Sequence, residues 1–166
     1  AGQTGEVVAP FEQRDDASVR VPTEMRPGNY VFRDRTQVAL GAATLETCAM
    51  FVEATVVSHP MKNRLILDCG SKTLTNDLAR GFAPQPGYGL VVHLDGTPDP
   101  SLVIERLSEE HAVVRAATPT RLTIGDRVRV LPNHACVVSN LHDRIYGVRG
   151  EAVEAVFEVA ARGWVD

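Results

Sequence analysis

The sequence predicts a mainly β fold: an antiparallel β-barrel or sandwich with a few short helical turns. Short runs rich in β-branched residues recur along the chain and are separated by turn residues at near-regular intervals. No segment keeps the 3.6-residue period of a long amphipathic helix. The clearest run, residues 49–58, contains Thr55, Val56 and Val57 in succession. This combination is typical of all-β sandwiches and barrels.

The first half of the chain contains the strongest hairpin signal. Tyr30 opens an expected strand that continues toward residue 40, and residues 44–47 are expected to form one helical turn capped by Thr44. Strands are predicted at 49–58 and 64–68. The short connection between these two runs predicts that they pair as a hairpin.

The second half continues with shorter strands between breaks. A helical turn is expected at 76–80. A loop is expected at 84–89 and a further break at 98–100, because proline and glycine interrupt these stretches. The remaining strands are predicted at the following positions: 90–94, 102–107, 112–116, 127–130, around Tyr146, and 153–160.

Composition limits the function classes. The 166 residues suit one domain, and 44% hydrophobic with 23% charged residues is ordinary for a soluble globular protein. A formal net charge of −4 argues against a nucleic-acid partner. No apolar run approaches the roughly 20 residues of a membrane span, and no secretory leader is recognisable. Three dispersed cysteines do not form a disulfide pattern, so a cytoplasmic location is expected.

A histidine and a cysteine two residues apart form the strongest candidate site. His134 and Cys136 follow the predicted strand 127–130, and Pro132 marks its end. If the chain stays extended, residues two apart point the same way, which would place an imidazole beside a thiolate. Such a pair suits zinc or another divalent metal and leaves positions open for water or substrate. The alternative is a strand end that carries a partly buried cysteine and a turn histidine.

Several segments together resemble the C-terminal domain of the D-serine dehydratase and D-threonine aldolase family. These are pyridoxal-phosphate enzymes of the alanine-racemase fold type, and the resemblance runs from about residue 23 to the end. The segments that carry it, in matching order and approximate spacing, are RPGNYVFRD at 26–34 with Gln37, DCGSK at 68–72, EEH at 109–111, PNHAC at 132–136, and NLHD at 140–143 with Tyr146.

The resemblance implies that a large part of the enzyme is missing from this chain. In the family, pyridoxal phosphate and its Schiff-base lysine belong to a larger N-terminal TIM barrel, which 166 residues cannot include as well. Residues 25–166 are therefore expected to form a C-terminal metal-binding β domain, preceded by a lead-in or junction segment at 1–24. Alone, this chain is expected to be inactive. Its implied partners are the missing barrel domain, a D-amino-acid substrate and a second subunit in a homodimer.

The resemblance also implies a reaction. The expected activity is that of a pyridoxal-phosphate-dependent lyase, in which a metal meets the β-hydroxyl of a D-3-hydroxy amino acid. A Lewis acid at that hydroxyl can assist its loss, giving dehydration, or lower its pKa, giving retro-aldol cleavage. A thiolate such as Cys136 resembles the dehydratase version and a carboxylate the aldolase version. D-serine dehydratase-like chemistry is therefore favoured, with D-threonine aldolase-like cleavage as the alternative.

Further residues are candidates for supporting the metal ligands or facing the substrate. They are Asn133, His142, Lys72, Glu110, His111 and Tyr30. For each of these residues a turn, core or surface role is an alternative. Two other functions also stay open. One is a metal-free β-barrel for interaction or dimerisation. The other is a stand-alone zinc module, for which His142 with Cys69 or His111 would have to supply the extra ligands.

Overall fold

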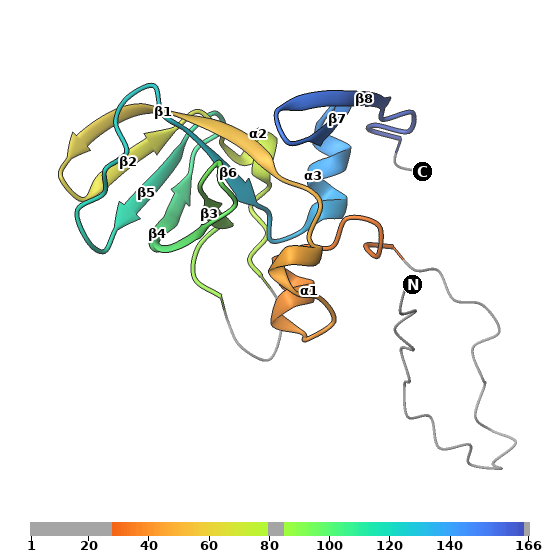
Figure 1. Cartoon of the computed structure of the whole chain (residues 1–166), viewed down its shortest axis with the longest axis horizontal. Helices are drawn as coiled ribbons and strands as arrows, with labels where there is room; N and C mark the ends of the chain where they lie inside the picture. Colours follow the sequence, from red (N-terminus) through yellow and green to blue (C-terminus); the bar gives the residue numbers. More distant parts are fainter. Residues whose placement is uncertain (1–27, 80–84, 165–166) are drawn as a thin grey trace, which may run out of the picture.

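Six antiparallel strands form a closed barrel in the computed structural model, which describes residues 28–79 and 85–164. The order around the barrel is β1-β2-β5-β4-β3-β6, and pairing of β1 with β6 closes it (Figure 1). The strands are β1 (Val52–Met61), β2 (Arg64–Leu67), β3 (Leu90–Val92), β4 (Pro98–Leu107), β5 (Ala112–Ala116) and β6 (Arg127–Leu131). The predicted mainly β fold is confirmed as a barrel.

Alternation along the strands builds the core. Val52 and Ala54 of β1 are buried opposite Val130 and Val128 of β6, while the residues between them face outward. The predicted hairpin is confirmed, since β1 turns into β2 with Met61 opposite Arg64. Closure leaves the barrel strands without a free edge, so all six backbones are paired.

A helix, not a strand, occupies the segment after Tyr30, so that prediction was wrong. Helix α1 (Arg35–Ala39) begins at Asp34, whose Oδ1 accepts the Gln37 N–H at 3.0 Å. This is a side-chain cap of the kind that starts helices. The helical turn predicted at 44–47 is confirmed as η1 (Leu45–Thr47) with Thr44 at its N-cap.

The short helical turn between β2 and β3 lies earlier than predicted. Helix α2 (Ser71–Leu74) follows Gly70, while residues 76–79 form no helix. The backbone N–H groups of Ser71 and Lys72 bond the carbonyls of Ser108 and Glu109, which fixes α2 against the β4–β5 turn. The break predicted at residues 98–100 was also wrong. Strand β4 begins at Pro98, because proline is compatible with the first position of a strand.

The C-terminal part adds a helix and a hairpin to the barrel. Helix α3 (Ala135–Leu141) follows β6 and leads to the hairpin of β7 (Arg144–Arg149) and β8 (Ala152–Glu158). These last two strands pair with each other outside the barrel and lie beside α3 (Figure 1). Within the described ranges, no helix is long and apolar enough to cross a membrane.

Candidate metal site at the start of helix α3

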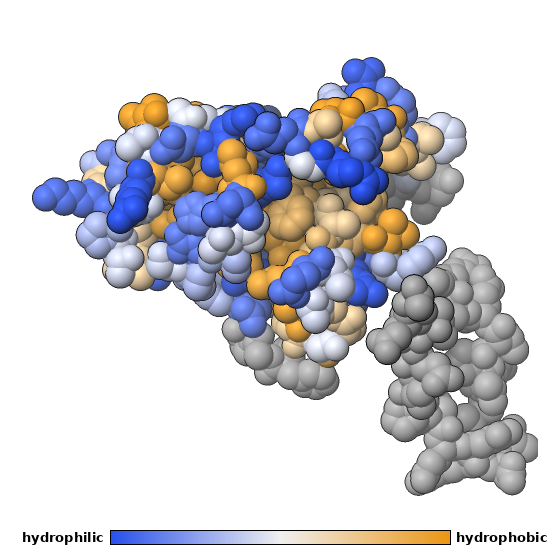
Figure 2. All heavy atoms as spheres, viewed as in Figure 1, coloured by the Kyte–Doolittle hydropathy of each residue, from blue (hydrophilic) through white to orange (hydrophobic). Residues whose placement is uncertain are grey.

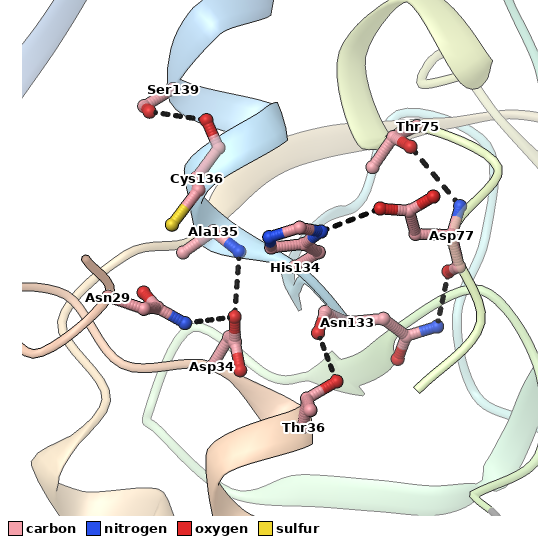
Figure 3. Close-up of polar contacts among 10 residues, drawn as sticks. All are labelled: Asn29, Asp34, Thr36, Thr75, Asp77, Asn133, His134, Ala135, Cys136 and Ser139. Atoms are coloured by element: carbon pink, nitrogen blue, oxygen red, sulfur yellow. Dashed lines mark hydrogen bonds and ion pairs between the residues drawn. The ribbon is translucent and has the colours of Figure 1, made fainter. Parts of the chain in front are cut away.

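His134 and Cys136 lie at a strand-to-helix junction, and the predicted extended backbone past Pro132 was wrong. His134 is extended and forms the N-cap of α3, whereas Cys136 is already in the first helical turn. The helix starts here because the Asp34 carboxylate accepts the Ala135 N–H at 2.9 Å, which satisfies a donor that a helix N-terminus leaves free. The junction, and not strand alternation, places the imidazole and the thiol at one end of α3 (Figure 3).

Asp77 is the side-chain partner of His134. The distance between His134 Nδ1 and Asp77 Oδ2 is 2.6 Å, and the two side chains are 43% and 37% exposed. With the proton on Nδ1, the imidazole donates to the carboxylate and keeps a lone pair on Nε2. Figure 3 shows Asp77 on one side of the ring and Cys136 on the other. The sequence analysis missed Asp77, because it lies 57 residues away and has no local motif.

Asn133 ties the surrounding loops together. Its buried side chain donates from Nδ2 to the carbonyls of Asp77 (3.0 Å) and Gly87 (2.9 Å). Its own backbone carbonyl accepts from the Thr36 hydroxyl at 2.7 Å. These contacts hold the backbone on both sides of the His134–Asp77 pair, and no described contact joins Asn133 to the imidazole or the thiol.

The second candidate ligand is accessible. Cys136 is exposed, and partial desolvation together with the Asp34 carboxylate raises the pKa of its thiol. Asp34 itself is buried and also accepts from the Gln37 N–H and the Asn29 amide. By contrast, burial raises the pKa of the Cys69 thiol to about 12, and that sulfur lies inside the barrel core.

The other predicted residues lie in separate places. His142 ends α3 and its Nε2 lies 3.2 Å from the Thr73 carbonyl, which links α3 to α2. Lys72 forms ion pairs with Glu110 (2.7 Å) and Glu109 (3.0 Å), which raise the pKa of its ammonium group to about 12. His111 is exposed in the β4–β5 turn, and Tyr30 is 67% exposed.

The donor chemistry fits a metal that is held by two protein ligands. An imidazole nitrogen and a thiolate are ligands that zinc prefers, and a site with few protein ligands keeps positions for water or substrate. No group of three or more histidine, cysteine, aspartate or glutamate side chains gathers as a metal site among the residues with described positions. The described residues therefore contain no closed zinc site with four ligands.

Comparison with known proteins decides the family. The family model described as "Putative serine dehydratase domain" matches residues 49–148. The chain belongs to this family. D-threo-3-hydroxyaspartate dehydratase of Delftia sp. is 38% identical over 69% of the chain, and D-threonine aldolase of Arthrobacter sp. is 33% identical over 90%. The chain covers 32% and 37% of these two enzymes, so it spans about a third of their length.

Solved structures of the family share the fold. The Delftia dehydratase superposes with a TM-score of 0.70 at 30% identity, covering 76% of this chain and 36% of the enzyme. A metal-free form of that enzyme, with a cysteine replaced by alanine, gives a TM-score of 0.68. The family also includes short relatives; for example, an uncharacterised protein of Mycobacterium tuberculosis is 38% identical, and the match covers 96% of its length.

Proposed function

We propose that this chain is the metal-bearing C-terminal β domain of a pyridoxal-phosphate-dependent lyase that acts on D-3-hydroxy amino acids. The proposed domain comprises residues 25–166, and the expected lead-in or junction segment, residues 1–24, lies outside the described residues. The observation that carries the proposal is the pair His134 and Cys136 at the start of α3, in a family that includes D-amino-acid dehydratases and aldolases. The chain covers about a third of these enzymes, which leaves room for a separate cofactor domain.

His134 Nε2 and Cys136 Sγ are the proposed metal ligands. D-threo-3-hydroxyaspartate dehydratase has been solved with a histidine and with a cysteine replaced by alanine, and the structure of the cysteine variant is of a metal-free form. The two replaced residues are two positions apart in that enzyme, which is also the spacing of His134 and Cys136. Asn133 and His142 have supporting roles, because they hold the backbone around α3. Lys72, Glu110, His111 and Tyr30 lie at the surface, apart from the proposed ligands.

The chemistry divides between the two domains. A zinc or other divalent ion at His134 and Cys136 would supply a Lewis acid for the β-hydroxyl of the substrate. Pyridoxal phosphate, which the larger domain would hold, supplies the electron sink for the α-carbon. The role of this chain would be to present the partly exposed His134 imidazole and the exposed Cys136 thiol at the start of α3.

Loss of the hydroxyl as in D-serine dehydration is the favoured reaction, because a thiolate ligand at Cys136 suits zinc. Retro-aldol cleavage is the second candidate. The match to D-threonine aldolase over 90% of the chain supports it. Free thiols at all three cysteines agree with a reducing, cytoplasmic compartment.

The missing barrel domain is the proposed partner, together with a second subunit in a homodimer. A hairpin of two strands is marginal by itself, and the β7–β8 hairpin exposes Tyr146, Val148, Val153, Val156 and Phe157. Apolar side chains also gather in the hollow between the hairpin and the barrel (Figure 2). This surface suits contact with the larger domain. A metal-free interaction domain would use the same surface but would not need His134 and Cys136.

A chimera tests the proposal directly. Residues 25–166 would replace the matching C-terminal part of the Delftia dehydratase, and the product would be supplied with pyridoxal phosphate and zinc. We expect turnover that stops on chelation and in the His134→Ala chimera. Ammonia and pyruvate from D-serine would identify dehydration, whereas glycine and acetaldehyde from D-threonine would identify the aldolase. A folded chimera that binds the cofactor but shows no metal-dependent turnover of these substrates or of D-threo-3-hydroxyaspartate would contradict the proposal.

A further inference from the structure

Asp77 approaches His134 from a different part of the chain. It follows α2, whereas His134 caps α3, and their side chains meet at 2.6 Å. The Asp77 carboxylate has no other described side-chain partner. Its side chain is 37% exposed, so it is not part of the buried barrel core. A short contact between two partly exposed groups, made across 57 residues of sequence, requires that both backbones are held in place.

The backbone of Asp77 is fixed from both sides. Its N–H donates to the Thr75 hydroxyl at 3.1 Å, and its carbonyl accepts from Asn133 Nδ2 at 3.0 Å. Thr75 is buried and has φ 64° and ψ 164°, a conformation that is essentially restricted to glycine. Strain of this kind persists only where the surroundings impose it and is concentrated at functional sites. The turn therefore holds the Asp77 carboxylate in one position.

We propose that Asp77 is a positioning residue that fixes the tautomer and orientation of the His134 imidazole for metal binding. This inference rests on the proposed function of His134. A carboxylate at Nδ1 requires the proton on that nitrogen, and Nε2 is then the atom with a free lone pair. Asp77 thereby selects Nε2 as the metal-binding atom, since Nδ1 faces the carboxylate.

The other carboxylate near α3 has a different role. Asp34 is buried and accepts two backbone N–H groups, from Gln37 and Ala135, so its replacement affects the helix termini. Asp77 has no backbone donor on its carboxylate among the described contacts. Asp77→Asn is therefore expected to leave the fold intact. The carboxamide introduced by this substitution can donate to Nδ1, which favours the proton on Nε2 and blocks the metal-binding lone pair, as carboxamides do opposite catalytic histidines.

The tautomer is measured first, without metal. Long-range ¹H–¹⁵N NMR of the full chain, at a pH where the imidazole is neutral, assigns the protonated ring nitrogen by comparison with His134→Ala. The parent is expected to carry the proton on Nδ1 of His134, and Asp77→Asn is expected to shift it toward Nε2. The matched control is Asp143→Asn, which changes an exposed carboxylate that pairs with Arg162. An unchanged tautomer in Asp77→Asn would overturn the inference.

Cobalt(II) titration measures the consequence for metal binding. Absorption from thiolate-to-cobalt charge transfer reports the Cys136 ligand, and the dissociation constant follows from the titration. Asp77→Asn is expected to bind about 10- to 100-fold more weakly than the parent, while Asp143→Asn is unchanged. If His134→Ala loses cobalt binding but Asp77→Asn binds cobalt as tightly as the parent, the inference is overturned and the proposed metal ligands still stand. A parent without the thiolate band would contradict the proposed function itself, and the inference with it.

Discussion

The carboxylate of Asp34 accepts the backbone N–H of Ala135 at 2.9 Å, across 101 residues of sequence. The same side chain caps α1 through Gln37, so one buried carboxylate organises the N-termini of two helices. One of these helices carries Cys136 and is preceded by His134. The candidate metal site therefore depends on a residue outside the proposed pair of ligands.

Replacement of Asp34 is expected to destabilise the protein. Asp34→Ala removes the acceptor for the N–H groups of Gln37 and Ala135, and a buried donor without a partner costs about 1–3 kcal/mol. Urea denaturation should show at least that loss in the free energy of unfolding. Asp143→Ala, which removes an exposed ion pair with Arg162, should change it by no more than about 1 kcal/mol. Equal losses in the two variants would contradict the capping role.

Gly70 is expected to tolerate no side chain. A Cβ at this position would lie 2.2 Å from the carbonyl oxygen of Glu109, and both groups belong to backbone that is fixed by the hydrogen bonds of α2. Gly70→Ala should therefore lower stability by about 1–3 kcal/mol, as overpacking usually does.

Gly28 provides the matched control for this change. A Cβ added there would meet no atom within 4 Å, so Gly28→Ala should leave the thermal midpoint close to that of the parent. If Gly70→Ala unfolds at the same temperature as Gly28→Ala, the close contact between α2 and the β4–β5 turn does not exist in solution.

Protonation of Asp126 in acid is expected to lower the free energy of unfolding of the protein. The Thr123 N–H and hydroxyl, at 2.7 and 3.0 Å, bond its carboxylate and lower the pKa of that group. A carboxyl group with a lower pKa in the folded state adds stability above its unfolded pKa, and the gain is lost as the pH falls through the folded pKa. The difference in unfolding free energy between the parent and Asp126→Asn should shrink as the pH is lowered from neutral into that range. A difference that is independent of pH would contradict this assignment.

The mainly β fold was predictable because short apolar and β-branched runs between turn residues indicate strands, whereas the choice between a barrel and a sandwich stayed open in the sequence. The predicted β1–β2 hairpin and the strands at 102–107 and 112–116 appear in the structure for this reason. The errors are at places where a distant partner decides the backbone. The segment after Tyr30 forms α1 because the Arg35 N–H bonds the Pro132 carbonyl and Asp34 caps the helix. Local patterns do not contain these partners.

The candidate site was only partly accessible to sequence analysis. His134 and Cys136 could be named from their chemistry and from the family resemblance, but the backbone conformation at these two residues could not be predicted. It was expected to be extended, and it turns into α3 because Asp34 satisfies the first helical N–H. Asp77 was missed for the same physical reason, since the turn at Thr75 that delivers it has no recognisable sequence signal.

The zinc content of the chain tests the central claim most directly. The parent, His134→Ala and Cys136→Ala would be loaded with zinc, freed of excess and analysed by mass spectrometry, with His111→Ala as a control for an exposed histidine away from the site. The parent and His111→Ala are predicted to retain about one zinc ion per chain, and both ligand variants to lose it. Zinc retained equally by all four proteins, or by none of them, would contradict a metal site at His134 and Cys136.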